Sequence, residues 1–331
     1  MKKTKVVITG GAGFIGSHLC EFLKKMNYSV VVIDDLSSGS LKNIPKGVKF
    51  YNLDISKKNK KFEKIFDNTK YVFHLAALAD IVPSIENPYR YYDVNVTGTL
   101  NVLSACLNKN VKKVIYAASS SCYGIPLKFP TNENSKLIPQ YPYALTKMLG
   151  EQLVKHWGQV YKLKFTSLRL FNVYGTRART SGGYGAMFGV FLAQLANKKP
   201  FTVVGNGNQK RDFTYVTDVC RAFYLSAIKK KSDYETLNVG SDNPKSVNYI
   251  IKILDSEAKK IYLPKRPGEP DITFADTKKI KKILNWSPLI SIEKGILILK
   301  DNIDLWKKAP LWNKKKIAKA TKLWFRFLKD E

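Results

Sequence analysis

Continuous apolar runs alternate with helical patterns through the first half of the chain. The runs are short and rich in β-branched and aromatic residues, and they occupy residues 5–9, 28–33, 48–53, 71–75, 113–118 and 164–171. Apolar residues at helical spacing fill residues 14–26, 88–107 and 143–161 between them. Strands that are apolar on both faces and alternate with helices are typical of a parallel sheet covered by helices on each side. The pattern therefore predicts a doubly wound α/β fold.

The rhythm becomes irregular from about residue 172, where glycines and prolines are more frequent and short strands such as 201–204 appear. We expect residues 1–171 to form the parallel-sheet domain. Residues 172–305 should form mainly a smaller C-terminal α/β substrate lobe, with some strands or helices returning to the sheet, and residues 306–331 a basic, aromatic tail. Ligands bind at the carboxyl edge of open α/β sheets, which this lobe would cover.

A glycine-rich turn directly follows the first run and opens the first helix. Gly10 permits a tight turn, Gly13 lets the backbone approach a pyrophosphate, and Gly16 lets the helix pack on the strand. The N-terminus of the helix then faces the phosphates. Asp34 ends the second run 24 residues after Gly10, where a carboxylate accepts hydrogen bonds from ribose and repels a 2′-phosphate. The sequence thus predicts a Rossmann-type domain that binds NAD rather than NADP.

Tyr143 and Lys147 are four residues apart in the helical pattern 143–161, so their side chains share one face. An ammonium group beside a phenol stabilises the phenolate and lowers a pKa that is ordinarily about 10. Tyr143 would then be a general acid and base near neutral pH. Ser119 and the two serines after it follow the run 113–118, and their hydroxyls could bind a reacting sugar hydroxyl.

The chain from about residue 5 to 300 resembles the extended short-chain dehydrogenase/reductases, specifically the nucleotide-sugar epimerase/dehydratase group. The resemblance rests on ordered motifs: TGGAGFIG (9–16), Asp34, LDI (53–55), HLAA (74–77), Asn95 in NVTGT, SSSCYG (119–124), YALTK (143–147), LRLFNVYG (168–175), RDFTYVTD (211–218) and RPGEP (266–270). It implies the Rossmann-type sheet with its smaller lobe, NAD as cofactor, and no metal.

The resemblance also implies three sets of site residues. The catalytic set is Ser119, Tyr143 and Lys147. The cofactor-binding set is Gly10, Gly13, Phe14, Ile15, Gly16, Asp34, Asp35, Asp54, Ile55, Leu75, Ala76, Ala77, Asn95, Tyr143, Lys147 and Phe171. The substrate-binding set is Ser120, Ser121, Asn172, Val204, Arg211, Arg266 and Thr273.

Individual roles follow from the same resemblance. Asn95 corresponds to the residue that steadies the active-site helix. Arg211 and Arg266 correspond to arginines that clamp the substrate diphosphate, which a guanidinium fork can bind with two hydrogen bonds. Arg177 and Arg179 lie in a nearby glycine-rich loop, where they would either assist this clamp or serve as surface charges.

The serines after Ser119 distinguish between reactions. Related sugar 4,6-dehydratases carry an Asp-Glu pair where Ser120 and Ser121 stand here, and UDP-glucuronate decarboxylases typically carry a glutamate at the second position. We therefore expect 4-epimerisation of a UDP-sugar, with those reactions and a UDP-glucuronate epimerase as alternatives. Thr273 is small at a position that tends to exclude N-acetyl sugars when bulky. A silent NAD-binding scaffold or redox sensor is disfavoured because it would not need Tyr143.

Composition changes this picture little. The 331 residues carry a net charge of +30, but 48 of the 56 basic residues are lysines spread along the chain. Readers of phosphates and bases favour arginine, so a solvated lysine surface is favoured over nucleic-acid binding. The four cysteines form no CxxC pair, and no apolar run approaches the roughly 20 residues that span a bilayer. We expect a cytoplasmic enzyme without signal peptide or transmembrane segment, and the family resemblance implies a homodimer.

The C-terminal tail differs from the rest of the chain in its concentration of basic and aromatic residues. Residues 307–331 hold nine basic and two acidic residues, and Ile317, Ala320, Trp324 and Leu328 recur near helical spacing. An amphipathic helix of this kind either contacts an anionic membrane or a partner protein, or docks on its own domain. Docking on its own domain is the favoured interpretation.

Overall fold

The computed structural model describes residues 3–57, 60–178 and 187–328. Its main sheet is parallel throughout, with strand order β11-β6-β5-β4-β1-β2-β3. The strands are β1 (Lys5–Thr9), β2 (Ser29–Asp34), β3 (Lys49–Asn52), β4 (Tyr71–His74), β5 (Lys113–Ser119), β6 (Phe165–Leu170) and β11 (Glu235–Val239). The predicted doubly wound, Rossmann-type sheet is confirmed, and β11 joins it from beyond residue 172.

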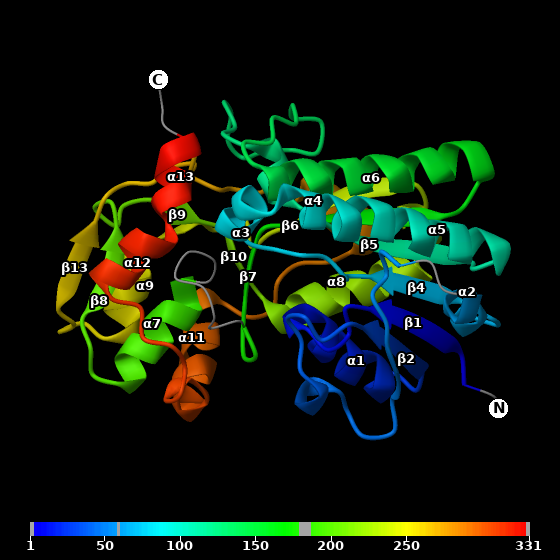
Figure 1. Cartoon of the computed structure of the whole chain (residues 1–331), viewed down its shortest axis with the longest axis horizontal. Helices are drawn as coiled ribbons and strands as arrows, with labels where there is room; N and C mark the ends of the chain where they lie inside the picture. The colour runs from blue at the N-terminus through cyan, green and yellow to red at the C-terminus, as the bar shows by residue number, and fades with distance from the viewer. Residues whose placement is uncertain (1–2, 58–59, 179–186, 329–331) are drawn as a thin grey trace.

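Helices cover both faces of this sheet, as Figure 1 shows. In β1, Val6 and Ile8 belong to one apolar cluster and Val7 to another, because successive strand side chains point to opposite faces. The first cluster is completed by α1 (Phe14–Lys25) and α8 (Val216–Ile228). The second is completed by α2 (Lys60–Ile65), α5 (Gly98–Asn108) and α6 (Pro142–Tyr161). The continuous apolar runs in the sequence reflect this burial on both faces.

The helical pattern at 88–107 does not form one regular helix. It comprises α4 (Pro88–Tyr92), a π-helical turn η2 (Asp93–Thr97) and then α5. Such π turns are rare and are frequent at functional sites. Asn95 lies within this turn.

The smaller lobe is built from short paired strands and helices. The strand pairs are β7 (Asn172–Tyr174) with β10 (Phe213–Tyr215), β8 (Phe201–Val204) with β13 (Lys260–Leu263), and β9 (Lys210–Arg211) with β12 (Lys245–Ser246). The helices of the lobe are α7 (Met187–Ala196), α9 (Val247–Leu254) and α11 (Ile292–Asp301), whereas α10 (Lys278–Leu284) packs against β11 of the main sheet and against α8. Further short elements are α3 (Ile81–Glu86), η1 (Leu41–Asn43), η3 (Ser120–Tyr123), η4 (Lys230–Ser232) and η5 (Ile303–Trp306).

The C-terminal tail docks on its own chain. Its stripe is divided at Thr321 into α12 (Lys314–Ala320) and α13 (Lys322–Phe327), drawn in red in Figure 1. Ile317 and Trp324 are buried. The docked interpretation is therefore confirmed for the described part of the tail. Within the described ranges, none of the helices is both long and apolar enough to cross a membrane.

Candidate active site

A cavity of about 610 Å³ lies where the carboxyl ends of the parallel strands meet the smaller lobe. Pockets of this size hold drug-sized and cofactor-sized ligands. With one exception, Asn95, every predicted site residue lines it. The lining also includes residues that the sequence analysis did not assign to the site: Leu78, Asp80, Ile81, Gln140, Tyr141, Phe188, Gln209, Glu269, Ile317 and Trp324 among others.

The glycine turn leaves a backbone-lined cradle at one end of the cavity. Gly10 has a φ of +76°, and a Cβ there would lie 2.6 Å from the backbone nitrogen of Ala76. A Cβ on Gly16 would lie 2.0 Å from the carbonyl oxygen of Gly10. At Gly13, by contrast, the nearest atom to an added Cβ is 3.3 Å away. The position predicted to face a pyrophosphate is the least crowded of the three, so these residues fit a dinucleotide.

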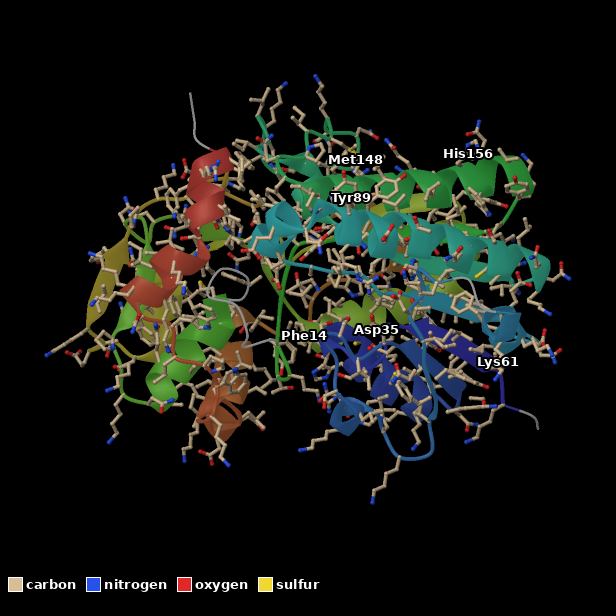
Figure 2. The ribbon with its side chains drawn as sticks, viewed as in Figure 1. Phe14, Asp35, Lys61, Tyr89, Met148 and His156 are labelled. Atoms are coloured by element: carbon tan, nitrogen blue, oxygen red, sulfur yellow. The ribbon has the colours of Figure 1, made fainter. Side chains whose placement is uncertain are left out.

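Carboxylates border the same end. Asp34 is buried and accepts hydrogen bonds from two backbone N–H groups at 2.9 Å, and its burial raises its pKa despite them. Arg90 joins two further carboxylates, with N–O distances of 3.5 Å to Asp35 and 3.0 Å to Asp54. Figure 2 shows Phe14 and Asp35 near the middle of the molecule, where the first helix starts and the second strand ends. Acceptors for ribose hydroxyls are thus held in place.

Asn95, which was predicted to contact the cofactor, does not line the cavity. Its side chain accepts a hydrogen bond from the Leu78 amide at 2.8 Å and donates to the Leu78 carbonyl at 3.0 Å. It also donates to the Thr146 hydroxyl at 3.0 Å. Asn95 therefore ties the loop after β4 to α6, because the π turn buries its amide between them. Its geometry matches the steadying role rather than cofactor contact.

The three catalytic candidates meet at the centre of the cavity. Tyr143 and Lys147 lie on the first turns of α6, which begins at Pro142, and Ser119 ends β5. The Tyr143 hydroxyl donates to Ser119 Oγ at 3.5 Å, and Ser119 Oγ lies 2.7 Å from Ser121 Oγ. The Lys147 ammonium lies over the ring of Tyr116, 4.4 Å from its centroid.

Burial decides the acidity of this group. It raises the pKa of Tyr143 to about 12, although the hydrogen bond with Ser119 acts in the opposite direction. It lowers the pKa of Lys147 to about 8, against the charges of Cys122 and Glu151. The predicted lowering of the Tyr143 pKa was wrong in direction, because burial is the larger effect. A phenolate here would need positive charge in the cavity, and Lys147, which also lines it, is protonated below about pH 8.

Two guanidinium groups border the opposite end of the cavity. Arg211 forms an ion pair with Glu269 at 3.0 Å and donates to the Lys210 carbonyl at 2.9 Å. Arg266 lies over the indole of Trp324, 5.2 Å from the ring. Burial lowers the pKa of Arg266, an effect that Glu269 opposes and Arg211 reinforces. Two guanidinium groups at one end of the cavity suit the two phosphates of a diphosphate.

Small polar side chains connect the two ends. The Thr273 hydroxyl donates to Asn172 Oδ1 at 2.8 Å and accepts from the Asp212 amide at 3.1 Å. Arg177, in contrast, is paired with Glu21 on α1 and does not line the cavity. Arg179 lies outside the described residues.

Two of the residues that the sequence analysis did not assign to the site differ in how far they could have been predicted. Tyr141 stacks on Tyr143, with ring centroids 6.4 Å apart and planes 8° apart, and its proximity in sequence could have identified it. Trp324 lies far along the chain from every motif, and its place in the apolar stripe of the tail predicts a packed helix but no contact with the site. Its place in the cavity depends on how the tail folds back.

Comparisons with known proteins agree with this geometry. The NAD dependent epimerase/dehydratase family model matches residues 6–240. The UDP-glucuronate 4-epimerase of Thermodesulfobacterium geofontis is 37% identical, over 91% of this chain and 98% of its own. The structure of Thermotoga maritima UDP-glucose 4-epimerase with UDP-glucose is similar at a TM-score of 0.86 and 33% identity, over 92% and 99% of the two chains.

A further solved structure adds a different sugar. The UDP-N-acetylglucosamine 4-epimerase of Methanobrevibacter ruminantium, in complex with UDP-N-acetylmuramic acid, is similar at a TM-score of 0.84 and 32% identity. The match covers 91% of this chain and all of that chain. These similar proteins share a fold and a reaction type but differ in the sugar that they bind.

Proposed function

Because the chain belongs to the NAD-dependent epimerase/dehydratase family, we propose that this enzyme interconverts the C4 epimers of a UDP-sugar. The observation that carries the proposal is the hydroxyl cluster at the centre of the cavity. Tyr143 and Ser119 are in hydrogen-bonding distance, and Ser121 stands beside them where an eliminating enzyme needs a carboxylate. UDP rather than another nucleotide is supported by the names of the relatives.

NAD would be held by the cradle at Gly13, by the carboxylates of Asp34 and Asp35, and by Lys147 beside the catalytic tyrosine. When bound, NAD supplies a hydride acceptor and donor for C4 of the sugar. The chain itself supplies the proton chemistry. Tyr143 would take the proton of the C4 hydroxyl as the 4-keto sugar forms and return it when the alcohol forms again. Ser119 would hold that hydroxyl in place, and protonated Lys147 would stabilise the phenolate.

The alternative outcome, loss of water across C5 and C6, needs a base for the C5 proton and an acid for the departing hydroxyl. Ser120 and Ser121 have no suitable pKa for either task. Ser121 is also engaged by Ser119 at 2.7 Å. Returning the hydride to the opposite face of the ketone needs no additional group. This favours epimerisation over dehydration.

One side chain of the cavity wall bears on the choice of sugar. Thr273 is small and its hydroxyl is held by Asn172, which supports room for an N-acetyl group. We therefore propose UDP-glucose and UDP-galactose, with their N-acetylated forms, as substrates.

We also propose a homodimer that pairs through α4, α5 and α6. Their outer surface exposes large apolar side chains, including Tyr89 at 84% and Tyr92 at 50%. Leu100 and Leu145 are exposed on the next two helices. Figure 2 shows Tyr89 and Met148 on neighbouring helices of this layer. The free thiols of all four cysteines are consistent with the predicted cytoplasmic location.

The experiment is a panel of nucleotide sugars followed by NMR. UDP-glucose and UDP-galactose should interconvert without accumulation of NADH. A substrate deuterated at C4 should keep its label there, because one cofactor takes and returns the hydride. Movement of the label to C6, or loss of water, would show that carboxylates from elsewhere reach the sugar and that the proposal is wrong. Conversion of UDP-glucuronate alone would overturn the sugar assignment but leave the reaction type intact.

A further inference from the structure

We propose that Trp324 in the C-terminal tail is a positioning residue for the substrate diphosphate, because its indole ring holds the guanidinium of Arg266 in place. The inference rests on the proposed function, in which Arg266 binds that diphosphate. The tail would then be a wall of the substrate site.

The orientation of the Trp324 side chain is set by contacts outside the cavity. Its side chain is 1% exposed, although it belongs to a basic segment whose lysines are exposed. Its indole N–H donates to the carbonyl oxygen of Pro267 at 2.7 Å. A buried indole with a satisfied N–H has a defined orientation. The ring is thus a rigid surface inside the protein.

Two consecutive residues of the arginine loop contact this surface, and the next lies near another residue of the tail. The Arg266 guanidinium is 5.2 Å from the centroid of the indole ring, the Pro267 carbonyl accepts the hydrogen bond of the indole N–H, and Gly268 lies near Leu328. A Cβ added to Gly268 would lie 4.0 Å from the Leu328 Cβ. The tail therefore supports the backbone of the loop as well as its side chain.

Stacking is a suitable way to hold an arginine that must bind phosphate. A guanidinium group over an aromatic ring is attracted through its face, whereas its N–H groups point outward in its plane. The face and the donating edge are then used by different partners. An arginine side chain carries about 2 kcal/mol of rotamer entropy, part of which a substrate would otherwise have to offset on binding. Trp324 would remove that cost in advance.

The tail also reaches the other wall of the site. Helix α13 packs against α3, whose first residue Ile81 lines the cavity from the sheet domain. Ile317 of α12 lines it as well. In Figure 1 the red helices run along the smaller lobe toward α3. Trp324 lies outside residues 6–240, the part of the chain that the family model matches.

The test compares binding of UDP and of uridine to the NAD-loaded enzyme. Trp324→Met removes the ring but keeps an adaptable apolar side chain. We expect it to weaken UDP binding about five- to tenfold, between the effects of an exposed and of a fully desolvated cation–π contact, with uridine binding unchanged. Trp324→Phe keeps an aromatic face and should stay within about threefold of the unmodified enzyme. The matched control is Trp306→Met, since Trp306 is equally buried but outside the cavity.

A double-mutant cycle assigns the effect to Arg266. Trp324→Met should have no further effect on UDP binding when Arg266→Ala is already present. UDP binding by a folded Trp324→Met variant within twofold of the unmodified enzyme would overturn the inference, as would equal losses for UDP and uridine. If Arg266→Ala itself leaves UDP binding unchanged, the proposed diphosphate clamp fails instead.

Fluorescence provides a measurement that does not depend on the stability of a variant. UDP should change the tryptophan emission of the unmodified enzyme because its diphosphate binds the guanidinium that lies over the Trp324 indole, and uridine should not. Trp324→Phe should abolish this change while UDP still binds. An emission change that persists in Trp324→Phe would locate the response at another tryptophan and contradict the inference.

Discussion

The two ends of the cavity are built in different ways. The cofactor end consists of backbone and small residues from strand ends that are adjacent in the sheet, with Gly10, Gly13 and Ala76 in the closest approaches. The substrate end consists of long charged side chains from separate elements of the smaller lobe. There Arg211 is held by Glu269, and Arg266 by Trp324.

This difference determines what each end can tolerate. A backbone cradle has no rotamers to order, but an added methyl group fills it. An arginine clamp tolerates changes of shape, but it depends on the side chains that orient it. The catalytic group lies between the two ends and is limited by burial. Burial disfavours the charged form of both residues, the phenolate of Tyr143 and the ammonium of Lys147.

The catalytic group should give the largest effect. Tyr143→Phe removes the hydroxyl that would exchange the C4 proton and keeps the ring. Turnover of UDP-glucose should fall about 100-fold or more, the usual scale for a positioned proton-transfer group. NAD binding should hardly change. The matched variant Tyr141→Phe, next to it in the stack, should lose much less activity in the same steady-state assay. Near-normal turnover by Tyr143→Phe would remove Tyr143 from the mechanism.

The sequence predicted the cofactor end because its chemistry is local. A glycine turn between a strand and a helix fixes Gly10, Gly13 and Gly16 together, and the ends of parallel strands then bring Asp34 to the same edge. The substrate end was predicted only through the family resemblance. Trp324 was not predicted, because no local pattern specifies where a distant tail docks.

The pKa shifts of Tyr143 and Lys147 also could not be predicted from the sequence. The four-residue spacing placed Lys147 on the same helix face as Tyr143, and the structure confirms that arrangement. The spacing carries no information on burial, however, and burial sets the direction of both pKa shifts. The sequence also did not predict that Asn95 lies outside the cavity lining. A π turn directs its amide into the protein, and the periodicity of the sequence predicted a regular helix.

A methyl group in the cradle tests the cofactor end. Gly13→Ala should still fold, since the nearest atom to the new Cβ, the Gly10 carbonyl oxygen at 3.3 Å, needs to shift by only a few tenths of an ångström. It should weaken NAD binding about tenfold or more, the cost of losing one or more charged hydrogen bonds to a pyrophosphate. Calorimetry measures the affinity, and UDP affinity is the internal control. Unchanged NAD binding would mean that the pyrophosphate does not approach Gly13.

Cofactor choice is expected to depend on charge at the same end. The unmodified protein, freed of copurified cofactor, should bind NAD more than about tenfold tighter than NADP, a difference of about 1.4 kcal/mol. The Asp34 carboxylate would repel the 2′-phosphate, so Asp34→Ala should reduce the preference. Both affinities can be measured by calorimetry. Tighter binding of NADP by the unmodified protein would reject the assignment.

The smallest effect concerns stability beneath the cofactor end. His74 ends β4, where its ring lies 2.7 Å from the Thr9 hydroxyl and 2.9 Å from that of Thr99. Burial lowers its pKa to about 3. Between about pH 6.5 and pH 3 the His74 imidazole is protonated in the unfolded chain but stays neutral in the folded protein. The free energy of unfolding therefore decreases as the pH falls through this window.

The linkage gives a magnitude and a control. From pH 7.5 to 5.5 the proton on the unfolded chain should cost about 1.4 kcal/mol of unfolding free energy, one pH unit below the ordinary histidine pKa. His74→Gln cannot take up that proton, so urea denaturation should show a correspondingly smaller loss. His156 is exposed on α6, as Figure 2 shows, and His156→Gln should leave the pH dependence unchanged. Equal losses in all three proteins would mean that the acid sensitivity arises from carboxylates elsewhere, and that the buried imidazole under the cradle has no part in it.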